Sequence, residues 1–243
     1  MKIKIYCGLC LVEEEVHKVL PDAIVAPPMK RGQILSDIES GVNVIGIADG
    51  SFHQAHAVSV NELRDGLRCG IAIYGSSSMG ALRAAELASY GMHGSGKIFE
   101  YITQSECFRD DFVGQVYSAH DDTLIKLSIP WVDFFFYLES KRAEQLLDLE
   151  SQERLLALFT KLDYPDRTSI GLENLIKAEG TFSKEVMILA KGAFTQTLNQ
   201  KKRDGQGMLE LIKKDIRRVE ILNANFDLIP DWIPPPIARD VDL

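Results

Sequence analysis

Apolar residues follow two different patterns along the chain, and each pattern predicts a different kind of structure. In the first half, short apolar runs of strand length alternate with amphipathic stretches of helical period. The runs at 2–7, 43–48 and 69–74 predict buried strands, and a shorter run lies at Ile24–Ala26. Strands and helices that alternate at this spacing are typical of βαβ units. Residues 1–125 are therefore predicted to form an α/β core with a mainly parallel sheet and flanking helices. The expected helices are 12–20, 33–40, 61–68 and 79–87.

From residue 126 the strand pattern disappears and long stretches of helical period follow. The tail at 231–236 reads Asp-Trp-Ile-Pro-Pro-Pro, which predicts an extended, polyproline-like path. Residues 126–243 are therefore predicted to form a helical region that ends in an extended Pro-rich tail. Among its expected helices are 168–178, 184–191 and 208–223.

Composition narrows the classes of partner and cofactor. The formal net charge of −8 disfavours nucleic acid as the main partner. No apolar run reaches the length of about 18 residues that a membrane span requires, so none is expected. Four cysteines do not suggest a disulfide scaffold and the N-terminus lacks signal-peptide features, so we expect a cytoplasmic protein. No glycine-rich phosphate motif follows a predicted strand, and we expect no cofactor.

One strand-to-helix turn stands out as a candidate for chemistry. The apolar run at 71–74 leads through Gly75 and three serines into the Ala- and Leu-rich helix predicted at Met79–Leu87. Such a turn places hydroxyls and backbone N–H groups at a helix N-terminus, where an anion or a developing oxyanion is stabilised. The structural alternative is that one serine caps the helix and the others fill a tight turn.

Other polar residues allow weaker interpretations. Asp49 follows the strand at 43–48, at the carboxyl end where ligand crevices of α/β sheets form. His53 and His56 come next in the chain, and solvated loop histidines are the simpler interpretation. The C-x-x-C pair of Cys7 and Cys10 is either redox-active or metal-binding, or simply two buried small apolar side chains.

Acidic residues in the middle of the chain raise the question of a metal site. Asp110 and Asp111 are followed by His120, Asp121 and Asp122. Carboxylates with a histidine can bind a divalent cation, but this spacing matches no defined site. We therefore expect a solvated loop or a docking surface here, and no metal.

A long block at 75–87, Gly-Ser-Ser-Ser-Met-Gly-Ala-Leu-Arg-Ala-Ala-Glu-Leu, is followed by Gly-Met-x-Gly-x-Gly at 91–96. With these features the chain resembles the TfuA-like family, partner proteins of YcaO enzymes in peptide backbone thioamidation that are named from trifolitoxin biosynthesis. The resemblance is strong over about residues 1–115. It is weaker from there to about residue 215, a range in which Gln200, Lys201 and Asp204 resemble a Q-K-x-x-D motif. The other matching residues are Pro27, Pro28, Arg31, Gly32, Asp49, Gly50, Phe52, Glu62, Leu63, Ile98, Phe99, Asp110 and Asp111.

The resemblance implies a function as well as a fold. Members of the family support YcaO enzymes as they replace an amide oxygen with sulfur. They hydrolyse the thiocarboxylated C-terminus of a ThiS-like sulfur-carrier protein, which releases sulfide, and they strengthen the association of YcaO with its substrate. The implied partners are therefore a YcaO-type enzyme, the carrier and the precursor peptide. The implied site resembles that of a hydrolase with a Ser-Lys pair.

Carried onto this chain, the resemblance assigns the serine more firmly than the lysine. Ser78 matches the fixed serine of the family, and Ser77 is the fallback. The proposed base is Lys201, with Lys202 and Lys30 behind it. A serine hydroxyl needs such a base before it can attack, and an uncharged lysine can supply one.

Supporting or carrier-binding roles are expected for Asp49, Ser77, Gly80, Arg83 and Glu86. Arg83 and Glu86 are three residues apart on one predicted helix and can form an ion pair. Two positions depart from the family pattern. Asn61 stands where family members commonly carry a lysine, and Cys10 stands where a serine or threonine is common.

Two hypotheses from different classes follow. The first is a hydrolase of the Ser-Lys type that frees sulfide from a thiocarboxylated carrier. The second is a non-catalytic adaptor that recruits or activates a YcaO enzyme and its peptide substrate. Asn61 favours the adaptor, whereas the intact block around Ser78 and the presence of Lys201 favour the hydrolase.

Overall fold

The structure is a computed structural model that describes residues 1–52, 56–106, 108–120, 123–196 and 199–226. Its centre is a five-stranded parallel sheet with the strand order β2-β1-β3-β4-β5. This result confirms the predicted α/β class. The last strand has only two residues, too short for its pattern to predict it. The strands are β1 (Ile3–Tyr6), β2 (Ile24–Ala26), β3 (Val44–Ile47), β4 (Ala72–Gly75) and β5 (His93–Gly94).

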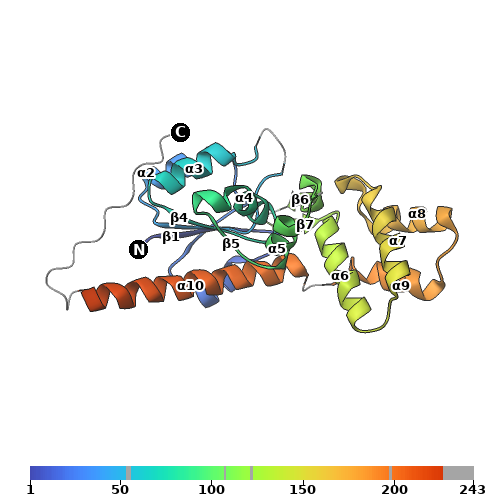
Figure 1. The fold of residues 1–243 in the computed structure, drawn as a ribbon. Helices are drawn as coiled ribbons and strands as arrows, with labels where there is room; N and C mark the ends of the chain where they lie inside the picture. The colour runs from blue at the N-terminus through green and yellow to red at the C-terminus, as the bar shows by residue number, and fades with distance from the viewer. Residues whose placement is uncertain (53–55, 107, 121–122, 197–198, 227–243) are drawn as a thin grey trace.

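Helices cover both faces of this sheet (Figure 1). One face carries α2 (Gln33–Glu39), α3 (Val60–Arg68) and α4 (Met79–Leu87), and the other carries α1 (Glu13–Val19) and α10 (Gln200–Phe226). Alternate strand residues divide between these layers, as the two-residue period of a strand requires. Ile45, Ile47 and Ile73 belong to the first core, and Ile5, Val44 and Tyr74 belong to the second.

A third core forms where the chain becomes helical. Helix α5 (Lys97–Gln104) follows the sheet and contacts both α4 and α10. Its buried residues join those of the following helices, and Trp131 stacks on Phe112 with ring centroids 4.3 Å apart. The helices of this region are α6 (Trp131–Ala143), α7 (Leu149–Thr160), α8 (Ser169–Glu179) and α9 (Lys184–Gly192). The short 3₁₀ helices are η1 (Ala88–Tyr90), η2 (Asp110–Phe112) and η3 (Tyr164–Asp166).

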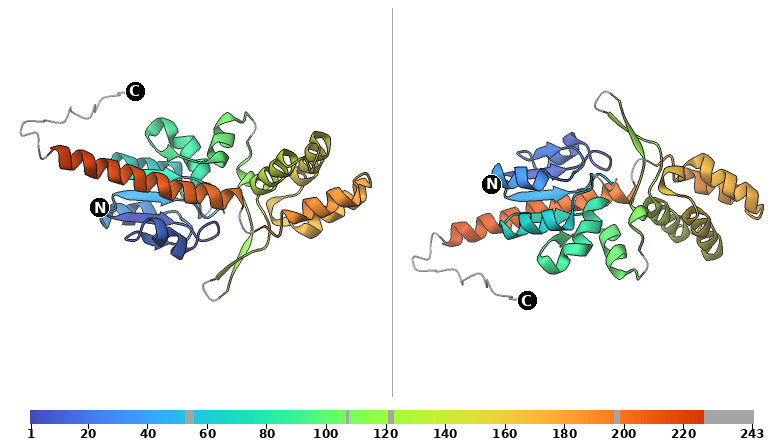
Figure 2. Two further views of the ribbon diagram at one scale, coloured as in Figure 1. Left: turned by 90° about the horizontal axis from the view of Figure 1, so that it is seen from below. Right: turned by 90° about the horizontal axis from the view of Figure 1, so that it is seen from above.

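The segment expected to be a solvated loop or a docking surface contains a hairpin, which corrects the loop and leaves the docking surface a prediction. Strands β6 (Tyr117–His120) and β7 (Thr123–Lys126) pair antiparallel and extend away from the body (Figure 2). The alternation of apolar and polar residues is weaker in these two strands than in a core strand, because apolar residues such as Ile125 are exposed. His53, Asp121, Asp122 and the Pro-rich tail lie outside the described residues.

The last helix differs most from the prediction. Helix α10 begins at Gln200, eight residues before the expected start, and it runs along the sheet (Figures 1 and 2). Met208, Leu209 and Ile212 belong to the same core as the strands, although the sequence groups this helix with the region 126–243. The division at residue 125 remains a prediction. In the described part of the chain, no helix has the length and apolar character needed to cross a membrane.

Candidate active site

The carboxyl ends of the strands border a cavity of about 340 Å³. In this strand order the direction of winding changes between β1 and β3, and open α/β sheets bind ligands at such a point. The cavity lies there, beside the ends of β1 and β3 and the turn after β4. Its lining residues are Leu9, Asp49, Gly50, Ser51, Phe52, Ser78, Val113, Gly114, Gln115, Val116, Tyr117 and Tyr164.

Asp49 organises the loop after β1. Its side chain is buried, and Oδ2 accepts hydrogen bonds from the backbone N–H groups of Gly8 (3.1 Å), Leu9 (2.9 Å) and Cys10 (2.9 Å). The other carboxylate oxygen, Oδ1, is buried and has no hydrogen-bond partner. One oxygen of Asp49 therefore holds the loop, and the other is unused at a residue that lines the cavity.

Two glycines allow the serine turn to close over β3. A Cβ on Gly80 would lie only 1.7 Å from the carbonyl oxygen of Ile47, and one on Gly75 would lie 2.2 Å from the carbonyl oxygen of Gly80. Between them, Ser77 adopts a left-handed conformation with φ of 67°, which costs on the order of 1 kcal/mol for a residue with a side chain. The first turn of α4 therefore packs against the carboxyl end of β3, and this contact fixes the position of the helix N-terminus.

The three serines of this turn face different surroundings. Ser76 and Ser77 are fully buried, and Ser77 Oγ donates to the carbonyl oxygen of Lys201 at 2.7 Å. Ser78 is the one that lines the cavity, and its Oγ donates to the carbonyl oxygen of Val113 at 3.4 Å. It immediately precedes α4, whose first N–H groups, those of Met79 and Gly80, have no acceptor within the helix. A hydroxyl that lines the cavity therefore stands next to two N–H groups that have no acceptor within their helix.

Lys201 is held in the first turn of α10 by buried polar contacts. Its backbone N–H donates to Asp133 Oδ1 at 3.2 Å, and Asp133 Oδ2 accepts from Asn199 at 2.8 Å. One turn later, Asp204 accepts from Gln200 and from the N–H groups at the start of α5. These bonds explain why Gln200, Lys201 and Asp204 are buried in the first turn of a helix, although the sequence reads there as a basic segment.

The side chain of Lys201 ends beside the cavity wall. The residue is 2% exposed, and its Nζ donates to Gln115 Oε1 at 3.0 Å. Gln115 itself lines the cavity, and its Nε2 is buried without a partner. Sequence reasoning did not single out Gln115. No local pattern marks it, because its contact with Lys201 joins residues 86 positions apart.

The structure therefore brings Ser78 and Lys201 to the same wall without joining them directly. Ser78 bonds Val113, and Lys201 bonds Gln115, two residues further along the same segment. Ser77, the fallback nucleophile, contacts the backbone of Lys201 rather than its amine. The assignment of a Ser-Lys pair stays a prediction, whether the serine is Ser78 or Ser77.

Lys201 opposes the effect of burial on the pKa of two buried groups, the Cys10 thiol and the Asp133 carboxyl. Burial raises the pKa of the Cys10 thiol well above its usual value, Asp49 adds to this effect, and Lys201 opposes it. Burial also raises the pKa of Asp133, again opposed by Lys201. Cys7 and Cys10 are free and buried, which suits the interpretation as small apolar side chains.

The two alternative lysines, and Asn61 at the position where family members commonly carry a lysine, lie away from this cavity. Lys202 pairs with Glu15 of α1 at 2.8 Å, and Lys30 is exposed. Asn61 is exposed on α3 and lines neither this cavity nor the second one described below. His56 is also exposed. Among the described residues, no group of three or more His, Cys, Asp or Glu side chains is arranged to hold a metal ion.

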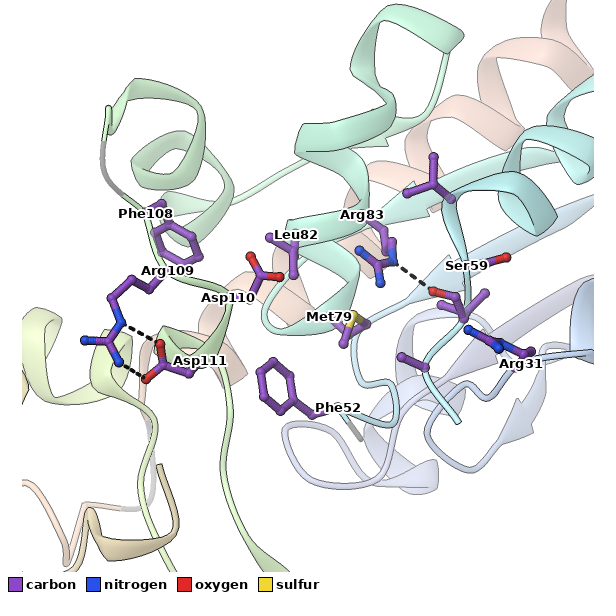
Figure 3. A pocket seen from close by; sticks show the side chains of 13 residues that line it. Arg31, Phe52, Ser59, Met79, Leu82, Arg83, Phe108, Arg109, Asp110 and Asp111 are labelled. Atoms are coloured by element: carbon purple, nitrogen blue, oxygen red, sulfur yellow. Dashed lines mark hydrogen bonds and ion pairs between the residues drawn. The ribbon is translucent and has the colours of Figure 1, made fainter. Parts of the chain in front are cut away.

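A second cavity of about 730 Å³ adjoins the first, and Phe52 lines both. Arg31 and Arg83 lie on one side of it, and Arg109 with Asp111 on the opposite side (Figure 3). Arg83 donates through Nε to the carbonyl oxygen of Val58 at 2.9 Å, and it forms the expected ion pair with Glu86 at 2.6 Å. The guanidinium of Arg83 is therefore fixed at the cavity by contacts on two sides.

Comparison with known proteins identifies the family. A search of curated proteins finds no match to the chain. Residues 49–168 match the family model described as TfuA-like protein. The matched range begins at Asp49 and includes the serine turn and α4. It also includes the residues at 113–117 and Tyr164, which line the 340 Å³ cavity. The chain is therefore assigned to the TfuA-like family through residues 49–168.

Proposed function

We propose that this protein hydrolyses the thiocarboxylated C-terminus of a ThiS-like sulfur-carrier protein and so releases sulfide for a YcaO-type enzyme that thioamidates a peptide. The family assignment supports the reaction class. The observation that carries the proposal is the position of Ser78, in a cavity at the N-terminus of α4, beside a wall that a buried lysine contacts through Gln115.

The reaction exchanges sulfur for oxygen at one carbon. The hydroxyl oxygen of Ser78 attacks the thiocarboxylate carbon while Lys201, in its neutral form, takes the hydroxyl proton. The N–H groups at the start of α4 stabilise the oxyanion, an effect often worth about 10²–10³ in rate for one donor. The carbon–sulfur bond breaks, sulfur receives the proton and leaves as HS⁻, and an ester remains on Ser78. Water then hydrolyses this ester to the carboxylate and regenerates the hydroxyl.

This sequence of steps requires the amine of Lys201 to reach Ser78 Oγ directly or through one water molecule. In the free protein the amine of Lys201 bonds to Gln115, whereas Ser78 Oγ bonds to Val113, two residues earlier in the chain. The proposal therefore includes a local rearrangement around Gln115 or a bridging water when the acyl group enters the cavity.

Mass spectrometry of the thiocarboxylated carrier tests the proposal. The wild type should convert the thiocarboxylate to the carboxylate, and Ser78→Ala should abolish the conversion. Ser77→Ala is the matched control, because it also removes a buried hydroxyl from the turn but not one at the cavity. An equally intact carrier with wild type and Ser78→Ala would eliminate the hydrolase.

A second candidate is a non-catalytic adaptor that recruits or activates a YcaO enzyme and its peptide. Two observations favour it: Ser78 and Lys201 each bond to other groups, and position 61 lacks the family lysine. Under this alternative, Ser78→Ala would support YcaO-dependent thioamidation as well as the wild type does. The hydrolase predicts that the same variant fails when the carrier is the sulfur source.

A further inference from the structure

The larger cavity, of about 730 Å³, has features that the proposed hydrolysis does not use. Its volume is typical of sites that bind small organic molecules. Arg31, Phe52 and Met79 line it, and they come after the carboxyl ends of β2, β3 and β4, the edge where α/β sheets bind ligands. Three arginines and two aspartates are among its lining residues, so cations outnumber anions there although the chain has a formal net charge of −8.

Two guanidinium groups lie on one side of this cavity (Figure 3). Arg83 is fixed, because its Nε donates to the carbonyl oxygen of Val58 and its Nη1 to Glu86, yet its Nη2 bonds no described residue. Arg31 is exposed, and no side chain in the described part of the chain accepts a hydrogen bond from its guanidinium. Both arginines therefore keep N–H donors for a ligand. Guanidinium groups suit phosphate, because one group can donate two parallel hydrogen bonds to it.

The opposite side of the cavity presents an acid. Arg109 bonds Asp111 through two nitrogens, so the charges of this pair balance (Figure 3). Asp110 is exposed at the cavity, and within the described residues its carboxylate accepts no hydrogen bond. Between the two sides the lining is apolar and includes the ring of Phe52, on which a planar group can stack. A complementary ligand is anionic at one end, aromatic in its body and a hydrogen-bond donor at the other end.

A nucleotide combines these three parts. We propose that the cavity binds a guanine nucleotide, with its phosphate at Arg31 and Arg83, its base against Phe52, and the edge of the base at Asp110. Proteins recognise bases by stacking them on aromatic rings and by accepting hydrogen bonds from their amino groups with carboxylates. Guanine is favoured among the bases because it offers two adjacent N–H donors, which match the two oxygens of a carboxylate.

Two observations bear on the choice of this ligand. An acidic polypeptide is disfavoured, because its carboxylates would meet Asp110 on the far side of the cavity. The chain lacks a glycine-rich phosphate loop after its predicted strands, but guanidinium groups bind phosphate without one. The inference goes beyond the proposed hydrolysis, since Arg31, Arg83 and Asp110 do not line the cavity that contains Ser78.

Isothermal titration of the full-length protein tests whether both ends of the ligand are recognised. The probes are guanosine monophosphate (GMP), guanosine and inorganic phosphate. GMP should bind at least 10-fold more tightly than guanosine, which lacks the phosphate, and than inorganic phosphate, which lacks the base. Inosine monophosphate (IMP) differs from GMP only in lacking the amino group, so it should bind about 10-fold more weakly.

Substitutions on the two sides of the cavity should act separately. Arg31→Gln should weaken the binding of GMP about 10-fold and leave that of guanosine unchanged. Asp110→Asn replaces one acceptor oxygen with a donor, so the preference for GMP over IMP should disappear. Arg68→Gln is the matched control, because it removes the same charge from an exposed residue that lines neither cavity. It should leave every affinity unchanged.

Several results would overturn the inference. They are the absence of GMP binding, equal affinity for GMP and inorganic phosphate, equal affinity for GMP and IMP, and GMP binding that Arg31→Gln does not weaken. Binding of a polyglutamate peptide in place of GMP would identify an acidic polypeptide as the occupant and overturn it as well. Arg31 and Asp110 are both exposed, so their variants should fold, which thermal unfolding checks. Each variant tests a different end of the ligand, and sulfide release from the carrier is measured independently of both.

Discussion

The close approach of α4 to β3 makes Gly80 the position where a single methyl group should have the largest effect. A Cβ there would lie 1.7 Å from the carbonyl oxygen of Ile47 and 2.7 Å from its carbonyl carbon. Ordinary contact begins at about 3.4 Å, so Gly80→Ala requires the helix start and the strand end to separate by about 1.7 Å. The obstacle is backbone, which cannot rotate away as a side chain can.

The expected destabilisation is about 3 kcal/mol, the upper part of the usual range for an added methyl group in a packed core. For a protein of this length, 1 kcal/mol corresponds to about 2–4 °C, so Tm should fall by about 6–12 °C. The separation also moves Ser78 and the N–H groups after it. A misplacement of about 1 Å commonly costs 10²-fold in rate, so sulfide release should fall by at least that factor.

Gly207 supplies the matched control. It lies within α10, and a Cβ there would meet nothing within 4 Å. Gly207→Ala should stabilise the protein by about 0.5–1 kcal/mol, because alanine loses less conformational entropy in a helix. Differential scanning calorimetry of the two variants measures both effects. A Gly80→Ala variant with wild-type Tm and activity would refute the reasoning about the turn.

Three further predictions concern charge, thiols and a buried cation. Lys177 and Lys191 lower the pKa of Glu173 to about 2, so its contribution to stability should be present above its unfolded value of 4.5 and disappear as the pH falls toward 2. In thermal unfolding between pH 6 and 2, the wild type should lose its advantage over Glu173→Gln, and a constant difference would contradict this. Burial raises the pKa of Cys7 to about 12 and that of Cys10 well above its usual value, so iodoacetamide at pH 8 should modify exposed Cys69 but neither buried thiol until the protein is unfolded, as peptide mapping can show. Arg167 is fully buried and bonds the side chain and carbonyl oxygen of Asp111, so Arg167→Met should cost about 3 kcal/mol in urea unfolding, and a cost below about 1 kcal/mol would show that the pair contributes little.

Sequence reasoning located those helices whose ends carry local signals. Helices α8 and α9 begin and end within one residue of their predicted limits. The side chains of Thr168 and Ser183 accept from N–H groups of the first turn, and Gly180 ends α8 in a left-handed conformation. Helix ends that are fixed by capping residues next to them in the chain can be predicted from the sequence.

Elements stabilised by distant partners could not be predicted in the same way. The first turn of α10 contains polar residues that look solvated in the sequence, yet Lys201 and Asp204 are buried by bonds to α5 and Asp133. The β6–β7 hairpin lacks the apolar content of a core strand, and β5 is too short to show a period. These features arise from contacts between segments far apart in the chain.

The candidate site shows the same distinction. Asp49 could be named from the sequence because it follows the predicted strand at 43–48, at the end where α/β sheets gather ligand-binding residues. Ser78 is distinguished from the two serines before it only by the resemblance to the family. Gln115 could not be named from the sequence, since its importance depends on Lys201 and on the shared cavity. The separation of Ser77 from Ser78 also needed the structure, which buries one hydroxyl against α10 and leaves the other at the cavity.

The most direct test follows the mass of the carrier's C-terminus over time. With the wild type, the thiocarboxylate should lose the mass difference between sulfur and oxygen and release one equivalent of sulfide. With Ser78→Ala and with Lys201→Met, the rate should fall to that of the carrier alone, while Ser77→Ala retains conversion. A carrier that stays thiocarboxylated with the wild type, or that is converted equally by Ser78→Ala, would contradict the assignment of this cavity as a hydrolase site.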